Sequence, residues 1–550
     1  MPATTLPDLF APFERDILLD VRTGKLKPMK GLSITSGIIK SSRTDPVFVS
    51  VTGIDSDEHD LTFHGGVDKA VHQYSPHHYT SWREEFPDNA KFFDVGGFGE
   101  NLVSNGMNER NICIGDIIRI GKEVVLQVSL PRQPCFKLNH RFEIKGFAPH
   151  TFKKSRTGWY YRVLKEGHIK VGDEIVLVER KHPKWTIERV QEYLHRDPNN
   201  LPMLEELEMI EEFGEECKGA FKRRVANLRA AEEEKLNGEK KVAESWADFE
   251  IIEKKKQTAR VTSFVLQAVD KGDGGDEIDP GCHARVKLPN GLIRPYSIVS
   301  GHSNKFEIGV ALEDNSRGGS LYLHQTAKVG DKIPVGKITQ SVPVAGMASN
   351  HILIAGGIGI TAFLPTVDIF DQINFNYELH YAVRTADDVP FQDLLEKVGP
   401  KLFLYNKAQG QRMDIPSLVR NRKWNTHIYV CGPQRMLDEV LQAGKECGMS
   451  PDEVHYEAFQ ISTSGDPFTV ELAKSNKTLH VDGDKSLLEV LRVAGLEVDS
   501  SCETGNCGTC RVEVCSGRVE HRGSALTEED KGNAMLSCVS RGIGHLVIDF

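Results

Sequence analysis

The spacing of apolar residues changes several times along the 550-residue chain. Residues 31–182 contain short runs in which apolar and polar positions alternate, and turn residues separate the runs. A period of two is typical of half-buried strands, so we expect a β-barrel or a compact β-rich domain here. The clearest of these runs are Asp116–Ile120, Val124–Ser129 and Glu174–Glu179.

Helical spacing replaces this alternation from about Trp185 to Leu228, with Thr186 as a plausible N-cap and a break at Asp197–Pro198. The following segment, Ala231–Lys241, reads AEEEKLNGEKK and has almost no apolar residue. We interpret it as a solvated helix end or a linker, and place a domain boundary there.

A second β-rich region covers residues 250–345, with a loop at Lys271–Glu277. In residues 350–460, apolar runs alternate with helical segments, which predicts a parallel sheet covered by helices. Ser462–Pro467 is interpreted as a second linker. The expected strands of the sheet are His351–Ala355, Glu378–Val383 and His427–Val430; beyond the linker come strands Phe468–Leu472 and Thr478–Val481 and a helix near Ser486–Ala494.

Composition narrows the class of protein. The length predicts about three to five domains. The net charge of −10 does not indicate the excess of basic residues that is typical of nucleic-acid-binding proteins. The longest apolar stretch, Ser341–Pro365, is broken by polar residues and glycines, so no membrane span is expected. The N-terminus lacks a secretory pattern, and five of the eleven cysteines cluster in residues 502–538 near the C-terminus. These features favour a reducing, cytoplasmic location with metal-bound thiolates.

Four of these cysteines form a specific motif. Cys502, Cys507 and Cys510 have C-x4-C-x2-C spacing, and Cys538 lies further along the chain. This spacing is typical of a plant-type [2Fe–2S] cluster, whereas a zinc site more often shows two C-x2-C pairs. The small residues of the loop let backbone N–H groups point at the sulfurs. The segment resembles plant-type ferredoxin domains, and Cys515 is interpreted as a packed thiol.

Two short motifs indicate a flavin. Arg294-Pro-Tyr-Ser297 matches the R-x-Y-S motif of the ferredoxin-reductase superfamily. The resemblance implies that Arg294 binds a flavin phosphate, that Tyr296 lies against the ring and that Ser297 approaches N5. Further on, Arg317-Gly318-Gly319-Ser320 combines exposed backbone amides with a cation and a hydroxyl. Such a cradle suits a terminal phosphate, which favours FMN over FAD.

A nucleotide-binding turn follows in residues 351–361, where an apolar strand leads into glycines and a helix start. In the same superfamily a turn such as Cys431-Gly432-Pro433 borders the nicotinamide, and an aromatic residue such as Phe459 lies near the flavin. Arg384 could contact the adenosine ribose. The glycine turn contributes Gly356, Gly357, Gly359 and Thr361.

Residues 250–550 together resemble the phthalate dioxygenase reductase family, whose members order an FMN domain, an NAD domain and a ferredoxin domain. No basic pair suited to a 2′-phosphate is evident, so NADH is favoured. Hydride carries two electrons and a [2Fe–2S] cluster accepts one, so the flavin is expected between them.

Three patches of the N-terminal half are less explicit. In LPRQPCFKL a lone cysteine, Cys135, follows two prolines and stands beside two cations, Arg132 and Lys137. The segments FHGGVDKAVHQY, which contains His64, Lys69 and His72, and FGENL are the other two. Taken singly, each could be a buried thiol or a turn.

In order, these patches resemble a MOSC domain of the YiiM type with a helical extension. The resemblance implies that Cys135 is the thiolate ligand of molybdenum in the molybdenum cofactor. Phe63 stands where the family has the first histidine of its HHGG turn. The basic residues could lower the pKa of the thiol or bind the pterin phosphate: His64, Lys69, His72, Arg132 and Lys137.

The predicted architecture is multidomain: a β-rich MOSC barrel with a helical extension, an antiparallel flavin-binding β-barrel, an α/β nucleotide-binding domain and a β-grasp ferredoxin. The expected boundaries are 1–182 (MOSC), 183–230 (three-helix extension), 231–249 (linker), 250–345 (FMN barrel), 346–461 (NAD domain) and 462–550 (ferredoxin).

The expected function is a self-sufficient reductase that passes electrons from NADH through FMN and [2Fe–2S] to a molybdenum cofactor, which reduces small molecules with an N–O bond. One alternative is a reductase component for a separate Rieske-type oxygenase, which adds an external electron-acceptor protein as a partner. Another makes the MOSC domain a sulfur-carrier or cofactor-binding module. Neither nucleic acid nor a membrane is an expected partner.

Overall fold

The computed structural model describes residues 10–60, 65–236, 246–272, 274–289, 291–313, 318–459, 463–475, 477–523, 525–527 and 530–550. The chain forms two compact units. The first comprises residues 1–241 with 346–349, and the second comprises residues 242–345 with 350–550. The boundary at residue 241 falls at the end of the charged segment in which the sequence predicts a linker.

A large mixed sheet forms the centre of the first unit. The predicted strands near residues 117, 124 and 174 are confirmed and lie side by side, because β10 pairs with both β11 and β14. Their inward residues, such as Ile118, Leu126 and Ile175, are fully buried in one apolar core. The order is β1 (Arg15–Ile17), β14 (Glu174–Glu179), β10 (Ile117–Ile120), β11 (Val124–Pro131), β12 (Trp159–Lys165), β8 (Val71–Gln73), β9 (Leu102–Val103), β2 (Asp20–Thr23) and β5 (Ser41–Ser42).

Smaller elements complete this unit. The unit also has a three-stranded sheet, in the order β13 (Gly167–Ile169), β6 (Val47–Ser50) and β7 (Gly53–Ile54), and a two-stranded sheet of β3 (Lys27–Pro28) and β4 (Thr35–Ser36). A second, aromatic cluster includes Tyr74, Trp82, Phe98 and Phe142. The helices α1 (His77–Glu85), α2 (Phe136–Phe142) and α3 (Phe147–Lys153) supply much of it.

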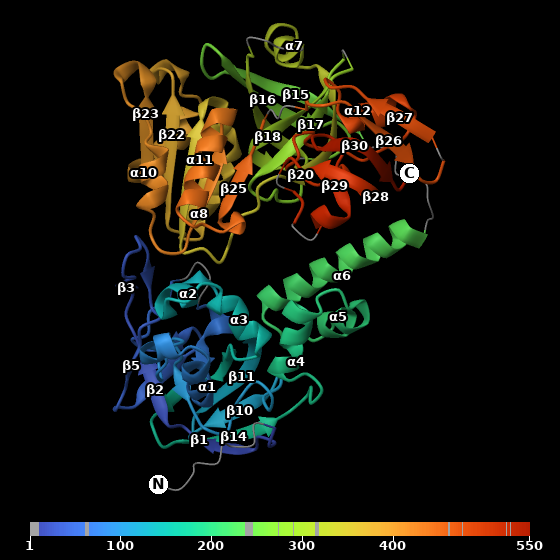
Figure 1. Cartoon of the computed structure of the whole chain (residues 1–550). Helices are drawn as coiled ribbons and strands as arrows, with labels where there is room; N and C mark the ends of the chain where they lie inside the picture. Colours follow the sequence, from blue (N-terminus) through green and yellow to red (C-terminus); the bar gives the residue numbers. More distant parts are fainter. Residues whose placement is uncertain are drawn as a thin grey trace. The chain divides into compact units, whose positions relative to one another are not determined.

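The helical extension begins where the sequence predicts it. The Thr186 hydroxyl accepts a hydrogen bond from the Arg189 N–H, which confirms the N-cap, and the first helical run ends at Arg196, just before Asp197–Pro198. The helix α6 packs Phe221 and Val225 against the core of the sheet, and it continues to Leu236, inside the predicted linker. The helical elements are α4 (Ile187–Gln191), a π-turn at Glu192–Arg196, α5 (Leu201–Glu208) and α6 (Glu215–Leu236), which is drawn in green in Figure 1.

An antiparallel closed barrel begins the second unit, as predicted. Its core is formed by alternate residues of each strand, among them Phe264, Ala284, Val286 and Ile308. The strand order is β15 (Ala247–Lys256), β16 (Val261–Ala268), β19 (Lys305–Ala311), β18 (Ile293–His302), β17 (Cys282–Lys287) and β20 (Lys332–Gln340), and the short helix α7 (Gly319–Gln325) follows β19.

The predicted parallel sheet is confirmed in the next segment, with helices on its faces (Figure 1). The helices α10 (Ile415–Arg420) and α11 (Gln434–Glu446) pack on one face through residues such as Val419 and Leu437. The strand order is β23 (Leu402–Asn406), β22 (Tyr377–Val383), β21 (Asn350–Gly356), β24 (Thr426–Cys431) and β25 (Val454–Glu457); α8 (Leu364–Gln372) and α9 (Gln392–Val398) are the other helices.

The C-terminal segment has a small mixed sheet with one helix. The helix α12 (Leu487–Val493) starts at Ser486, which forms a reciprocal capping box with Glu489. The predicted strands near 468 and 478 are confirmed, and β26 also pairs in parallel with the last strand. The order is β27 (Lys477–Val481), β26 (Phe468–Leu472), β30 (Arg541–Ile548), β28 (Arg511–Glu520) and β29 (Ala534–Leu536).

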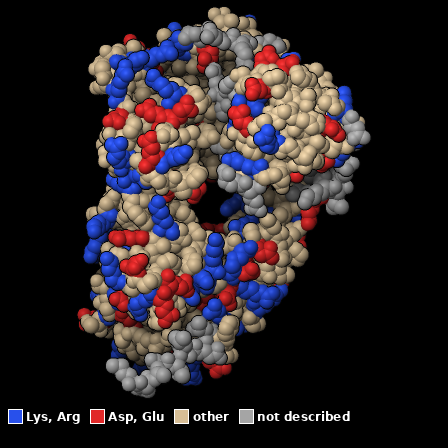
Figure 2. Space-filling view, in the orientation of Figure 1, with Lys and Arg blue, Asp and Glu red and all other residues tan. Residues whose placement is uncertain are grey.

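Charged side chains of both signs are interspersed over the face of the molecule shown in Figure 2. Within the described part of the chain, none of the helices combines the length and the apolar character that crossing a membrane requires.

Candidate functional site

One cavity of the second unit brings together residues from its three segments. It has an empty volume of about 990 Å³, which includes space open to solvent. Residues that the sequence predicts for a flavin line it beside the end of β25 and the cysteine loop. The principal lining residues are Arg294, Tyr296, Ser297, Ser320, Glu457, Phe459 and Cys502.

The barrel strand β18 supplies the flavin-facing residues. Arg294, Tyr296 and Ser297 follow one another on this strand, and burial raises the pKa of the Tyr296 phenol. The Ser297 hydroxyl is buried and has no hydrogen-bond partner among the described residues. A buried hydroxyl without a partner is costly unless a ligand satisfies it. This observation fits a flavin whose polar ring edge meets Ser297.

The glycines of the second flavin motif lie at the start of α7. Gly318 adopts φ +102°, and a Cβ on Gly319 would lie 3.2 Å from Cγ of Arg294. The backbone therefore approaches the Arg294 side chain closely, as a phosphate cradle requires. Arg317, the cation predicted beside these glycines, lies outside the described residues.

The nucleotide-binding turns meet at the carboxyl edge of the parallel sheet. Between β21 and β24 the strand order reverses direction, and ligands of open α/β sheets bind at such a point. A Cβ on Gly359 would lie 2.1 Å from the carbonyl oxygen of Cys431, and one on Gly356 would lie 2.7 Å from Cδ of Pro433. The two predicted turns are thus packed against each other, and only glycine allows this.

Other predicted nicotinamide residues surround these turns. The Tyr381 hydroxyl donates to the Gly357 carbonyl at 3.0 Å and fixes the first turn. Thr361 is buried and lines the flavin cavity, whereas Arg384 is exposed at the carboxyl end of β22. Gly432 completes the second turn, where a Cβ would lie 3.1 Å from the backbone nitrogen of Gly356.

Burial raises the pKa of two groups near this edge, Cys431 and Glu457. Burial, with the Glu457 carboxylate as a smaller cause, raises the pKa of Cys431 well above its ordinary value, so Cys431 is a thiol. Burial also raises the pKa of Glu457 to about 7, against the opposing effect of a hydrogen bond with Ser341. No sequence motif marks Glu457 as a functional residue beyond its position beside Phe459.

The four cysteines of the C-terminal motif lie in two pairs. The sulfurs of Cys510 and Cys538 are 3.1 Å apart, and a hydrogen bond between the Cys502 and Cys507 side chains lowers the pKa of Cys507 to about 5. No group of three or more His, Cys, Asp or Glu side chains in the described ranges is placed to hold one metal ion. Two pairs suit two irons, each completed by bridging sulfides, better than one zinc ion.

Backbone amides of the loop point at the sulfurs, as the sequence predicts. The N–H groups of Thr504 and Asn506 donate to Sγ of Cys502 at 3.4 and 3.2 Å, and that of Cys502 donates to Sγ of Cys507 at 3.4 Å. The Thr509 hydroxyl donates to the same Cys507 sulfur. These donors stabilise negative charge on thiolates and on a reduced cluster.

A second cavity lies in the first unit, with an empty volume of about 530 Å³. Three residues predicted from the cysteine patch line it: Arg132, Cys135 and Lys137. His72 and Gly99, from the other two patches, line it as well. The structure therefore brings the three sequence patches together.

Cys135 is half-buried and forms the N-cap position of α2. Arg132 is 4% exposed, and its Nε and Nη1 atoms have no hydrogen-bond partner among the residues described. Burial and the Arg132 charge lower the pKa of His72 well below its ordinary value, and Nε2 of His72 also lacks a partner there. The buried Arg132 donors fit an anionic, phosphate-bearing cofactor beside the Cys135 side chain.

The other predicted basic residues are placed differently. Lys137 forms an ion pair with Asp60, with Nζ and Oδ2 2.7 Å apart at the cavity wall. Lys69 forms an ion pair with Glu216 of α6 and is not among the cavity-lining residues. His64 lies outside the described residues, as does Phe63.

Lys40 and Tyr160 also line this cavity, and neither was predicted from the sequence. Lys40 is buried in an ion pair with Asp57, and burial lowers the pKa of Lys40. The ring of Tyr160 lies 5.1 Å from that of His72, between centroids. The sequence offers no local signal for these residues, because their partners come from distant strands.

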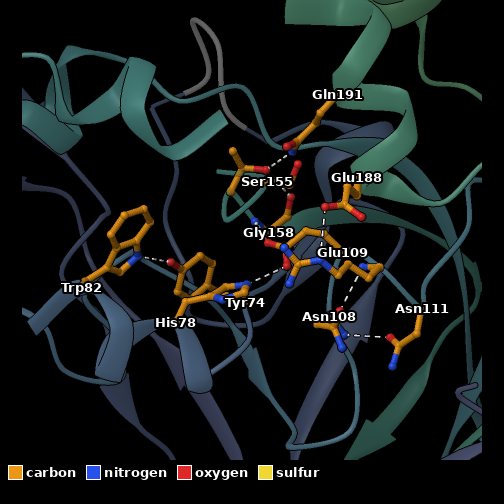
Figure 3. Close-up of polar contacts among 12 residues, drawn as sticks. Tyr74, His78, Trp82, Asn108, Glu109, Asn111, Ser155, Gly158, Glu188 and Gln191 are labelled. Carbon is orange, nitrogen blue, oxygen red and sulfur yellow. Dashed lines mark hydrogen bonds and ion pairs between the residues drawn. The ribbon is translucent and has the colours of Figure 1, made fainter. Parts of the chain in front are cut away.

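A buried carboxylate supports the wall behind Arg132. Glu109 accepts hydrogen bonds from the Gly158 N–H at 2.7 Å and contacts Nε2 of His78 at 2.6 Å (Figure 3). The Gly158 carbonyl in turn accepts from the Arg132 N–H at 3.0 Å. Gly158 adopts φ +79°, and a Cβ there would lie 2.6 Å from Nε2 of His72. Glu109 thus fixes the backbone that positions both His72 and Arg132.

Comparison with known families and proteins matches both halves of the chain. Residues 60–176 match the MOSC domain model, and residues 470–541 match the model of the 2Fe-2S iron-sulfur cluster binding domain. These matches confirm the MOSC and ferredoxin assignments made from the motifs.

Individual proteins are similar over larger spans. A protein named reductase from Gibberella moniliformis is 38% identical over 97% of this chain and 95% of its own length. Phthalate dioxygenase reductase from Burkholderia cepacia is 32% identical over 55% of this chain and 96% of its length. The crystal structure of YiiM from Geobacillus stearothermophilus is 28% identical, covers 38% of this chain and 99% of that chain, and has a TM-score of 0.33.

Proposed function

The chain belongs to the reductase family of its full-length Gibberella relative, and on this premise we propose that it is a self-sufficient, molybdenum-dependent reductase of N-hydroxylated compounds. Its C-terminal half is an NADH-dependent flavin and iron–sulfur oxidoreductase module of the phthalate dioxygenase reductase type. The proposed path runs from NADH through FMN and [2Fe–2S] to a molybdenum cofactor at Cys135.

The observation that carries this proposal is the cavity at Cys135. It presents a half-buried thiol, the buried neutral ring of His72, and Arg132 donors that have no partner within the described part of the chain. Cys135 would bind the metal, and Arg132 and His72 would bind the cofactor phosphate. When bound, the cofactor supplies a metal centre that accepts electrons singly and delivers two to an N–O bond.

The overall reaction is R–NHOH + 2 e⁻ + 2 H⁺ → R–NH₂ + H₂O. It consumes two protons, and Lys137 and Asp60 form a paired cation and carboxylate at the same cavity wall. We assign them to proton supply near the scissile N–O bond. His72 is neutral at physiological pH, so it can donate a hydrogen bond without adding a second cation beside Arg132.

In the second unit, each residue set has a distinct task in delivering electrons. The Gly359 and Cys431 turns would bind NADH at the sheet edge, and Arg294 and the Gly318 turn would bind the flavin phosphate. The flavin converts a two-electron donor into one-electron steps. Cys502 lines the flavin cavity itself, so the cluster site adjoins the flavin site.

Substitution of Cys135 tests the proposal. In molybdenum-loaded protein, Cys135→Ser should abolish NADH-dependent reduction of 6-hydroxylaminopurine and of an amidoxime. NADH–cytochrome c reductase activity should remain, because its path does not include Cys135. The structure exposes the Cys515 thiol, so the prediction of a packed thiol was wrong. Cys515→Ser is therefore the matched control and should retain both activities. Loss of both activities in Cys135→Ser, or of neither, would contradict the proposal.

A second candidate function is favoured by the similarity to phthalate dioxygenase reductase. In that case the second unit would supply electrons to a separate oxygenase, and the MOSC domain would not take part. Metal analysis discriminates the two: protein from a host that makes the cofactor should contain molybdenum near one equivalent under the first proposal and none under the second.

A further inference from the structure

The outer surface of the flavin barrel contains a histidine that is almost completely covered. His283 lies on β17 between Cys282 and Ala284, which face the barrel core. Because side chains alternate along a strand, His283 points away from that core. It is nevertheless only 1% exposed. Another part of the second unit must therefore cover it.

The covering segment is the cysteine loop. Nε2 of His283 lies 2.9 Å from the hydroxyl oxygen of Ser501, and Nδ1 lies 2.7 Å from that of Ser341. The Ser501 hydroxyl donates to the Thr339 hydroxyl oxygen at 3.1 Å. A neutral imidazole has one donor and one acceptor nitrogen, which matches one bond to each serine. Ser501 immediately precedes Cys502, the first cysteine of the cluster motif.

His283 also lies beside the flavin-facing residues. In the strand register it is directly opposite Ser297 on β18 and Thr339 on β20. Residues directly opposite in neighbouring antiparallel strands place their side chains on the same face, about 5 Å apart. His283 therefore connects the strand that presents Ser297 to the residue next to Cys502.

The loop is tied down on the other side of Cys502 as well. Nδ2 of Asn506 donates to the Ala458 carbonyl at 3.1 Å, and Ala458 lines the same cavity as Ser297. Ser501 and Asn506 thus anchor the loop to the barrel and to the end of the parallel sheet. Both anchors are buried, so each lost bond leaves a polar group unsatisfied.

We propose that His283 is a positioning residue for electron transfer, which clamps the cluster-binding loop against the flavin-binding face through Ser501. Electron transfer slows steeply as the separation of two centres grows, so a loosely held loop would reduce the rate of this step. The inference rests on the electron-transfer part of the proposed function and does not depend on the molybdenum site.

The test compares His283→Ala with wild type in the holoprotein, by anaerobic stopped-flow mixing with NADH. The rate at which NADH reduces the flavin should be unchanged, and so should the rate at which the protein reduces ferricyanide. Reduction of the cluster should slow by about ten- to a hundredfold, the scale of a small misplacement of reacting groups. His545→Ala is the matched control, because His545, an exposed histidine of the C-terminal segment, also contacts a hydroxyl, that of Thr469.

Two further measurements separate clamping from a general loss of structure. Ser501→Ala should reproduce the slowing, and the double variant should add little, because both residues act through one contact. Hydrogen–deuterium exchange of the amides in residues 501–506 should increase in both variants, with β26 and α12 unchanged. If His283→Ala fails to bind flavin, Ser501→Ala carries the test alone.

Unchanged cluster reduction in Ser501→Ala, or unchanged exchange in the loop, would overturn the proposal. Slower flavin reduction in His283→Ala with normal cluster reduction would instead place His283 in flavin binding and would also overturn it. Wild-type cytochrome c reduction independently measures the route from NADH through the flavin and the cluster, so a failure of the clamp is distinguishable from a failure of that route.

Discussion

Glu109 offers the sharpest test of how the first unit supports its cavity. Burial alone would raise the pKa of Glu109, but His78 and the Gly158 N–H outweigh it and hold the pKa below its ordinary value. Glu109 is therefore an ionised, fully buried carboxylate with two polar neighbours that depend on it. We predict that Glu109→Ala destabilises this unit and disorders the backbone that carries Arg132.

The magnitude follows from the partners left behind. Ionised Glu109 is the acceptor for two buried partners, and a hydrogen bond to a charged group contributes roughly 1.5–3 kcal/mol, so the loss of both costs roughly 3–6 kcal/mol. For a unit of this size, that loss corresponds to a fall in Tm of roughly 6–24 °C. Glu109→Gln retains the shape and one acceptor, so its effect should be smaller. Because the folded pKa is depressed, the stabilisation is present above the ordinary glutamate pKa of 4.5 and is lost as pH falls through the folded value.

Differential scanning calorimetry of wild type, Glu109→Gln and Glu109→Ala at pH 7 and pH 4 measures these effects. The midpoint temperature of the first unit should fall, while the absorbance of the flavin and of the cluster should show that the second unit remains intact. An unchanged first transition at pH 7, or equal shifts of both units, would refute the reasoning. A destabilisation that grows at low pH would refute the assigned charge state.

Three further predictions concern the second unit. Arg294→Ala removes the cation proposed for the flavin phosphate and should weaken FMN binding by about 1.5–3 kcal/mol, roughly ten- to a hundredfold; titration of apoprotein by flavin fluorescence measures this, and unchanged affinity contradicts the assignment. Glu457, whose pKa burial raises to about 7, contributes stability that is complete below pH 4.5 and is lost as pH rises through 7. Glu457→Gln should therefore raise the free energy of unfolding, measured in urea, relative to wild type at pH 8 but not at pH 4.5. An equal change in that free energy at the two pH values would contradict the raised pKa. Gly359→Ala places a Cβ 2.1 Å from the Cys431 carbonyl oxygen and should raise the KM for NADH while FMN content is retained; an unaltered KM would show that the two turns can separate freely.

The parts of the fold that the sequence predicts are those encoded locally. The strands at Val124 and Phe468 alternate in polarity, and the capping of Thr186 depends on residues within one turn. The cysteine spacing is likewise local, because one loop contributes three of the four sulfurs. In each case a short window contains both the residue and its structural reason.

Features that depend on distant partners were not predictable. Lys69 shares a segment with His72, yet its partner is Glu216 on α6, and it does not line the cavity. Lys40 is buried because Asp57 neutralises it, and His283 is covered by a serine more than 200 positions away in sequence. Neither the periodicity nor a motif around these residues contains that information.

The aromatic cluster of the first unit shows the same limit in its packing. Tyr74, Trp82, Phe98 and Phe142 come from separate helices and loops, and no regular period connects them. Stacked rings such as Tyr74 and Phe98, 4.0 Å apart between centroids, nonetheless form the floor next to the Arg132 site. Tertiary packing alone assembles such a cluster.

Re-oxidation of the reduced chain by substrate tests the central claim most directly. Molybdenum-loaded protein is reduced anaerobically with a stoichiometric amount of NADH, then mixed with 6-hydroxylaminopurine while the electron paramagnetic resonance signal of the reduced cluster is followed. The proposed route predicts that the signal disappears as aminopurine forms, and that it persists in Cys135→Ser. A cluster that stays reduced in the wild-type chain, or that is re-oxidised equally in Cys135→Ser, would contradict the account.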